Sequence, residues 1–171
     1  MRPTIKLLWQ ILAAMVIIFF RMEIDFVSNP FSGILPIGFL AVPLTLFWVV
    51  GMTNAINLID GLDGLAGGCL LVNALTFGVF GYLAGHARFS GYLRLIPVSG
   101  AGELTIYLAA MAGACLGFLW YNSHPAEIFM GDTSSLFLGG VISTVALCVK
   151  QELLLPIVGG VFVIETLSVI S

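Results

Sequence analysis

Charged residues are scarce in this sequence. Asp, Glu, Lys and Arg make up 9% of the 171 residues, whereas soluble domains carry about 25%. Hydrophobic residues make up 60%, and the mean hydropathy is +1.12. A chain with so few charges cannot cover itself with a water-soluble surface, so lipid must cover most of it. The composition therefore excludes an ordinary soluble domain.

Basic runs and cysteines are also in short supply. Six Lys and Arg residues face nine Asp and Glu residues, which gives a net charge of -3. Without a basic patch, no nucleic-acid partner is expected. The three cysteines, Cys69, Cys115 and Cys148, each lie inside an apolar stretch. This placement favours packing roles over disulfides or metal ligation.

Long apolar runs are abundant instead. A membrane-spanning helix needs about 20 mostly apolar residues. Six segments fit this description approximately: Lys6–Phe20, Ile34–Ile56, Gly64–Gly85, Leu104–Tyr121, Thr133–Val149 and a last one from Leu153 onward. The runs are continuous rather than alternating, which favours helices over a barrel. We therefore predict an all-α, polytopic transmembrane helix bundle of about six spans, with residues 1–171 forming a single membrane domain.

Small residues at helical spacing suggest where these helices meet. Gly64 and Gly68 are four residues apart, as are Gly113 and Gly117. Such spacing lets two membrane helices approach closely. We therefore expect both pairs to lie at helix contacts.

The number of spans determines on which side of the membrane each loop lies. The N-terminus, the loop Asn57–Asp63, the loop Asn122–Asp132 and the C-terminus fall on one side of the membrane, and the remaining connections fall on the other. Lys and Arg concentrate on the cytoplasmic side of membrane proteins. Arg2 and Lys6 lie on the loop side, and the opposite side holds the larger set: Arg21, Arg88, Arg94 and Lys150. This count alone places the two loops outside the cell.

The two loops hold four of the nine acidic residues: Asp60, Asp63, Glu127 and Asp132. No Lys or Arg occurs between Gly51 and Gly85 or between Glu103 and Val149, so the carboxylates require a counter-cation. Carboxylate and amide oxygens suit Mg²⁺ or Mn²⁺. A magnesium site at a membrane face indicates metal-assisted phosphoryl chemistry. The alternative is that the acids only solvate two short loops.

At these loops the sequence resembles a known family. Asn57–Gly64 and Phe129–Asp132 are similar to the signatures of the polyprenyl-phosphate N-acetylhexosamine-1-phosphate transferases. Gly117–Asn122 and Gly159–Ile170 narrow the resemblance to the branch that uses UDP-MurNAc-pentapeptide. Glu165, in the last of these segments, is an intramembrane acid, for which a functional role and a helix-to-helix hydrogen bond are equally plausible.

The resemblance implies a reaction. Undecaprenyl phosphate would attack the β-phosphate of UDP-MurNAc-pentapeptide, giving UMP and the lipid I of peptidoglycan and cell-wall synthesis. Mg²⁺, or Mn²⁺ in its place, would bridge the diphosphate. The implied location is the bacterial inner (cytoplasmic) membrane, with both motif loops cytoplasmic because the sugar nucleotide is made there. We prefer this orientation to the Lys and Arg count. A homodimer is left open as an assembly.

The resemblance also implies roles for individual residues. Asp60, Asp63 and Asp132 would be catalytic, and Asp132 and Asn57 would hold the metal. The substrate would be bound by Asn57, Gly61, Leu62, Asn122 and Phe129, with the Phe129 ring stacking on uracil. His124 could touch a phosphate, although a solvated loop histidine is the plainer interpretation.

Two departures from the family pattern stand out. Ser134 replaces the usual glycine, and would strain the loop if that position needs positive φ. A paired-aspartate motif normally precedes the segment like Ile5–Gln10, and a histidine-rich loop normally follows the span near Ile170; neither occurs here. We therefore expect an internal fragment that binds a cation but does not catalyse the reaction alone.

Three alternatives remain open. A sister transferase would use UDP-GlcNAc with a polyprenyl phosphate. A transporter piece would bind a passing cation, although transporter sites usually lie at mid-span. A non-catalytic remnant would only pack as helices.

Overall fold

The structure is a computed structural model that describes residues 3–29, 33–152, 154–158, 160, 164 and 168. Its elements are α1 (Pro3–Phe19), β1 (Phe26–Asn29), β2 (Gly33–Pro36), a 3-10 turn (Gly38–Leu40), α2 (Ala41–Ile59), α3 (Leu65–Gly85), α4 (Ala87–Leu93), α5 (Ala101–Asn122), α6 (Gly131–Cys148) and α7 (Leu154–Val158). Helices dominate, which confirms the predicted all-α membrane class.

Four of the described helical segments are long and apolar enough to cross a membrane: Gly38–Ile59, Leu65–Gly85, Ala101–Asn122 and Gly131–Cys148. The apolar helix Thr4–Phe19 is shorter. The last predicted span, from Leu153 onward, is described only in part, so the count of six stays a prediction.

The second predicted span begins later than the sequence suggested. Residues Gly33–Pro36 form β2, which pairs antiparallel with β1 in the register Phe26↔Pro36. Pro36 therefore lies in a hairpin rather than inside a helix. Pro43 lies in the first turn of α2, where a missing N–H costs no helical hydrogen bond. Apolarity alone could not separate the short strand from the helix that follows it.

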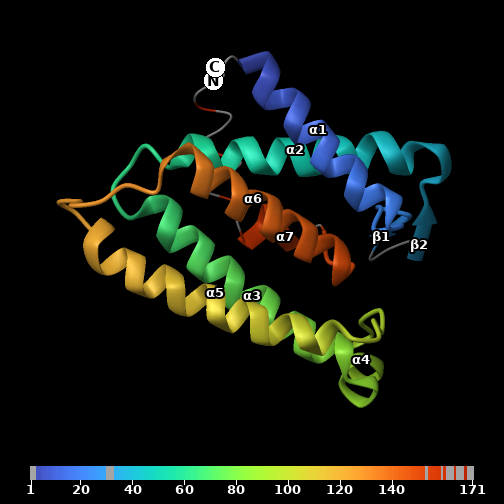
Figure 1. Cartoon of the computed structure of the whole chain (residues 1–171). Coiled ribbons are helices and arrows are strands. Elements are labelled where there is room, and N and C mark those ends of the chain that lie inside the picture. The colour runs from blue at the N-terminus through green and yellow to red at the C-terminus, as the bar shows by residue number, and fades with distance from the viewer. Residues whose placement is uncertain are drawn as a thin grey trace.

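Two helix pairs build the bundle (Figure 1). The ribbons of α3 and α5 run side by side, α6 lies along α2, and α1 crosses α2. The shared core includes the fully buried side chains of Ile56, Phe77, Leu108 and Ile142. Lipid tails are as apolar as these side chains, so van der Waals contact between them, rather than removal from water, stabilises the packing of the helices.

Glycines permit the close contacts, mostly at positions other than the predicted ones. A Cβ on Gly139 of α6 would lie 3.0 Å from the Thr53 Cα of α2, and a Cβ on Gly85 would lie 2.5 Å from the Gly102 backbone nitrogen of α5. Only glycine fits at such distances. The expected contact at Gly64 is confirmed, because a Cβ there would lie 3.8 Å from the Asn122 carbonyl oxygen of α5. Those at Gly68, Gly113 and Gly117 are wrong, because no described atom beyond the local helix backbone lies within 4 Å of a Cβ built there. Four-residue spacing does not reveal which face of a helix meets its neighbour.

The connections between the helices lie at two opposite ends of the bundle (Figure 1). The α2–α3 and α5–α6 connections lie at the end where α1 begins, and the hairpin, α4 and the turn after α6 lie at the other. This confirms that the two motif loops share one end of the molecule.

Candidate functional site

Asn122 fastens the two motif loops together. It is the last residue of α5, and only 4% of it is exposed. Its Oδ1 accepts a hydrogen bond from the Gly64 N–H at 3.1 Å, and its Nδ2 donates to the Ile128 carbonyl at 2.8 Å. Both ends of the amide are therefore occupied by loop backbone. Gly64 takes φ +73, a conformation that disfavours residues with a Cβ.

Asp63 makes a second tie between the loops. Its Oδ2 accepts a hydrogen bond from the Ala126 N–H at 3.1 Å and lies 3.0 Å from His124 Nδ1. The Ala126 amide, followed by His124, lowers the pKa of the Asp63 carboxyl below its ordinary value. Asp63 therefore holds the second loop against the first while it remains ionised. His124 thus has an acidic partner in the structure rather than only solvent.

Asn57 and Asp132 meet at the junction of α2 and α6. The Asn57 Nδ2 donates to Asp132 Oδ1 at 3.0 Å and to Ser135 Oγ at 2.8 Å. Asp132 lies in the first turn of α6, where the helix dipole favours negative charge. The structure thus brings together the two residues predicted to hold a metal, which lie 75 positions apart in the sequence.

A cation missed by the sequence analysis also reaches this junction. The Lys6 Nζ, on α1, donates a hydrogen bond to Asn57 Oδ1 at 2.6 Å. The Asn57 amide therefore links a lysine to an aspartate. The inference that the acids have no protein cation nearby is wrong, because the cation comes from a helix far from both loops in the sequence. Lys6, a charge inside a predicted membrane span, was the signal that could have found it.

Asp60 completes the polar cluster. It follows the last residue of α2 as the C-cap. Burial raises the pKa of its carboxyl, a hydrogen bond from the Gly131 backbone amide opposes this shift, and the nearby charge of Asp132 adds to it. Two carboxylates thus lie close enough to interact, an arrangement that a cation between them would stabilise.

The donor set fits a magnesium ion only in part. No group of three or more His, Cys, Asp or Glu residues in the described part of the chain is arranged to hold a metal. Mg²⁺ usually takes one or two protein carboxylates and fills its shell with water and phosphate oxygens. Asp60 and Asp132 match that requirement, whereas the Asn57 oxygen is already engaged by Lys6.

Comparison with known proteins decides the family. The family described as glycosyl transferase family 4 matches residues 1–150. The chain belongs to this family. It is 51% identical over 174 residues to the phospho-N-acetylmuramoyl-pentapeptide-transferase of Citrifermentans bemidjiense, covering 98% of this chain and 49% of that protein. It is 58% identical over 132 residues to the protein of the same name from Endomicrobium trichonymphae, covering 77% of this chain and 37% of that protein.

A third relative of that name, from Methylacidiphilum infernorum, is 55% identical over 134 residues, with 78% of this chain and 37% of that protein covered. At its widest coverage the chain spans about half the length of the curated relatives that it matches. The family assignment rests on these comparisons. The membrane-helix architecture rests on the long apolar helices of the structure.

The other predicted residues of this family 4 chain lie around the cluster. Gly61 and Leu62 are exposed at the tip of the first loop, and the Phe129 side chain on the second loop is 65% exposed. Glu127 is exposed as well, and its backbone N–H donates to the Tyr121 carbonyl at 2.8 Å. The substrate-binding assignments stay predictions. Glu165 lies outside the described residues.

Ser134 causes none of the strain that was anticipated. It lies within α6 in helical conformation, three residues after Gly131, which itself takes φ +72. The residue with the left-handed backbone conformation is therefore Gly131, at the start of the helix, and not Ser134. A serine is compatible with the helical position.

We predict that Asp63→Asn frees the second loop, because the neutral amide is a weaker acceptor for the Ala126 N–H than the carboxylate is. Hydrogen exchange at the Ala126 amide should become faster. In the unchanged protein the lowered pKa of Asp63 means that this protection is present above its ordinary pKa of about 3.9. It should be lost only as the pH falls through the lower folded-state value.

Glu127→Gln is the matched control, since it removes a carboxylate from the same loop. Its Ala126 exchange rate should equal that of the unchanged protein. Equal Ala126 exchange in Asp63→Asn and in the unchanged protein would contradict the anchoring role of Asp63.

Proposed function

We propose that this chain carries the metal- and phosphate-binding part of an enzyme that transfers phospho-MurNAc-pentapeptide from UDP-MurNAc-pentapeptide to undecaprenyl phosphate. The products are UMP and lipid I, the lipid-linked precursor in peptidoglycan biosynthesis. The observation that carries the proposal is the hydrogen-bonded series Lys6–Asn57–Asp132 beside the joined motif loops. The names of the relatives support the choice of substrates.

The cluster suits a diphosphate because it supplies both signs of charge. Phosphoryl transfer depends mainly on positioning and on neutralising the phosphate oxygens. Lys6 offers an ammonium group that can donate to a phosphate oxygen, and the Asn57 amide holds that group at the junction. Asp60 and Asp132 would hold Mg²⁺ or Mn²⁺, which would supply further neutralisation of the diphosphate.

The exposed loop residues suit the nucleotide. Phe129 presents an uncovered aromatic ring three residues before Asp132. Such a ring offers a stacking face for uracil. Gly61 and Leu62, on the facing loop, would border the base and leave its edge open to backbone groups. Asn122, with both ends of its amide occupied, would act by fixing the two loops rather than by touching substrate.

The position of the acids argues against a transporter piece. Asp60, Asp63 and Asp132 lie at helix ends or in a loop, whereas transporter sites lie near the bilayer midplane. For the same reason the site is open to a water-soluble sugar nucleotide. We place the motif loops on the cytoplasmic side of a bacterial inner membrane, where that substrate is made.

Replacing Asp132 by Asn should slow the transfer by about 100-fold or more, since it removes a metal ligand at the reacting phosphates. The assay measures how fast the full protein encoded by the gene releases UMP from UDP-MurNAc-pentapeptide and undecaprenyl phosphate, with saturating Mg²⁺. Glu127→Gln should retain full activity. Turnover near the original rate in Asp132→Asn, at equal expression and melting temperature, would refute the metal assignment.

Lys6→Met should also reduce UMP release, because it removes the cation while keeping a side chain of similar length. Lys6→Arg should restore part of the rate, since the charge returns on a differently shaped group. Arg88→Met, which removes an exposed cation from the opposite end of the bundle, serves as the matched control. A Lys6→Met protein as active as Arg88→Met would exclude Lys6 from the site.

Cysteine labelling tests the orientation. Ser123, beside the second motif loop, and Ser99, at the opposite end, are both exposed. With the three native cysteines replaced by alanine, Ser123→Cys should react only from the cytoplasmic face and Ser99→Cys only from the outer face. Ser90→Cys should stay unreactive, since Ser90 is buried. Reaction of Ser123→Cys only from outside would favour the Lys and Arg count instead.

A further inference from the structure

A second polar contact joins α1 and α2 one helical turn further into the bundle than the contact between Lys6 and Asn57. Gln10 follows Lys6 by four residues on α1, and Asn54 precedes Asn57 by three residues on α2. Residues at these spacings lie on the same face of a helix. The two helices run in opposite directions (Figure 1), so Gln10 and Asn54 meet at the next step of the same interface.

The side-chain amides of Gln10 and Asn54 are paired in both directions. The Gln10 Nε2 donates to Asn54 Oδ1 at 3.2 Å, and the Asn54 Nδ2 donates to Gln10 Oε1 at 3.0 Å. The Asn54 Nδ2 also donates to the Val50 carbonyl of its own helix at 2.8 Å. This bond orients the Asn54 amide, so α2 presents a fixed acceptor and a fixed donor to α1.

Few other contacts determine where α1 lies along α2. Among the described side chains of α1, Ala14 alone is buried, whereas Leu8 and Phe19 are exposed. Within the described residues, the side-chain hydrogen bonds of α1 are those of Lys6 and Gln10. Membrane helices gain little from apolar contact beyond what lipid offers, so hydrogen bonds between them weigh more. The amide pair is therefore well suited to fix the position of α1.

We propose that Gln10 and Asn54 are positioning residues for the Lys6 ammonium group. The amide pair holds α1 where the Lys6 Nζ reaches Asn57 Oδ1 at 2.6 Å. A shift of α1 by one turn would move the Lys6 backbone by about 5.4 Å and break that hydrogen bond. The effect of the pair on catalysis rests on the proposed function, whereas its effect on the position of Lys6 does not.

The position of the ammonium group matters because Lys6 lies near a predicted metal ligand. Asn57 accepts from Lys6 and donates to Asp132 Oδ1 at 3.0 Å. A lysine ammonium on a flexible stem pairs readily with a carboxylate. If α1 were free to move, Lys6 would pair with Asp132 directly and compete with the metal ion. By fixing α1, the amide pair keeps the lysine for phosphate and the aspartate for the metal.

Exchanging the two amides tests the proposal. Gln10→Asn makes the pair too short and Asn54→Gln makes it too long, whereas the double exchange restores the combined length. Each single variant should lower UMP release by the full protein about tenfold, since small misplacements of a reacting group are costly. The double exchange should recover most of the rate. Gln151→Asn, the same change at the opposite end of the bundle, is the matched control and should keep full activity.

A comparison in the Lys6→Met protein separates positioning from simple stabilisation. If Gln10 acts through Lys6, then Gln10→Asn should cause no further loss of UMP release once Lys6 is absent. If the amide pair only stabilised the bundle, Gln10→Asn would lower the rate by the same factor with and without Lys6. That second outcome would overturn the proposal.

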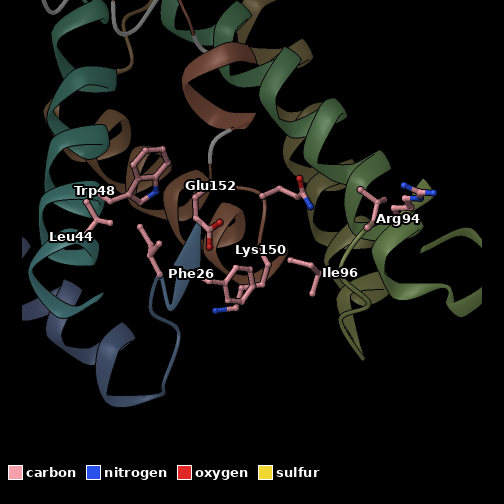
Figure 2. Close-up of a pocket in the computed structure, with 10 residues that line it drawn as sticks. Phe26, Leu44, Trp48, Arg94, Ile96, Lys150 and Glu152 are labelled. Carbon is pink, nitrogen blue, oxygen red and sulfur yellow. The ribbon is translucent and has the colours of Figure 1, made fainter. Parts of the chain in front are cut away.

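The reactivity of the lysines gives a readout that needs no turnover. Lys6 and Lys150 are the two lysines of the sequence. Gln10→Asn should speed the acylation of Lys6 by a succinimidyl ester about tenfold, because a hydrogen bond to the ammonium group is lost. Figure 2 shows Lys150 at the opposite end of the bundle, beside Phe26 and Glu152. Its acylation, measured on the same samples by mass spectrometry, should not change.

Unchanged acylation of Lys6 in Gln10→Asn would refute the positioning role. If acylation changes as expected but the unaltered protein releases no UMP, the proposed function fails and the positioning of Lys6 stands. If the single variants do not fold, the double exchange still decides. A folded double-exchange protein whose Lys6 is acylated faster than in the unaltered protein would contradict the proposal, and an equal rate would support it.

Discussion

The side-chain amide of Asn57 joins three helices at one point. It accepts from Lys6 on α1, belongs itself to α2, and donates to Asp132 and Ser135 on α6. An amide is suited to this position because it carries an acceptor and two donors on one flat group. A lysine and an aspartate are thereby held near each other without forming a direct ion pair. In the proposed function, the Lys6 ammonium could then donate to a phosphate oxygen and the Asp132 carboxylate could hold a metal ion.

The loops around this point are held by a different set of contacts. Asn122 binds backbone groups on both loops, and Asp63 accepts from the backbone of the second loop. Gly64 and Gly131 supply the two left-handed positions at which the chain enters α3 and α6. Together these residues fix the loops so that Asp60, Asp132 and Phe129 lie at the same end of the bundle. Preorganisation of this kind lowers the cost of arranging catalytic groups around a substrate.

A separate set of polar and charged contacts stabilises the opposite end of the bundle. Lys150 ties the turn after α6 to the segment before β1 through Asp25 and the Glu23 carbonyl. This contact joins residues 125 positions apart in the sequence. Lys150 and Glu152 line the same cavity at this end of the bundle. The two ends of the bundle thus carry separate polar groups. Apolar helices connect the ends, and these helices pack closely at glycines.

The sequence by itself determined the membrane class and most of the site's composition. Scarce charge and long apolar runs require lipid and helices. The two acidic motifs are enough to predict Asn57, Asp60 and Asp132 as members of the site. Only the tertiary structure decided that Lys6 meets Asn57, that Asn122 is buried between the loops, that residues 33–36 pair as a strand, and that Glu152 and Trp48 share a cavity. The physical reason is that helix formation follows from local apolarity and backbone pairing. Which faces of the helices meet depends instead on packing between distant segments, and four-residue spacing of glycines did not reveal it.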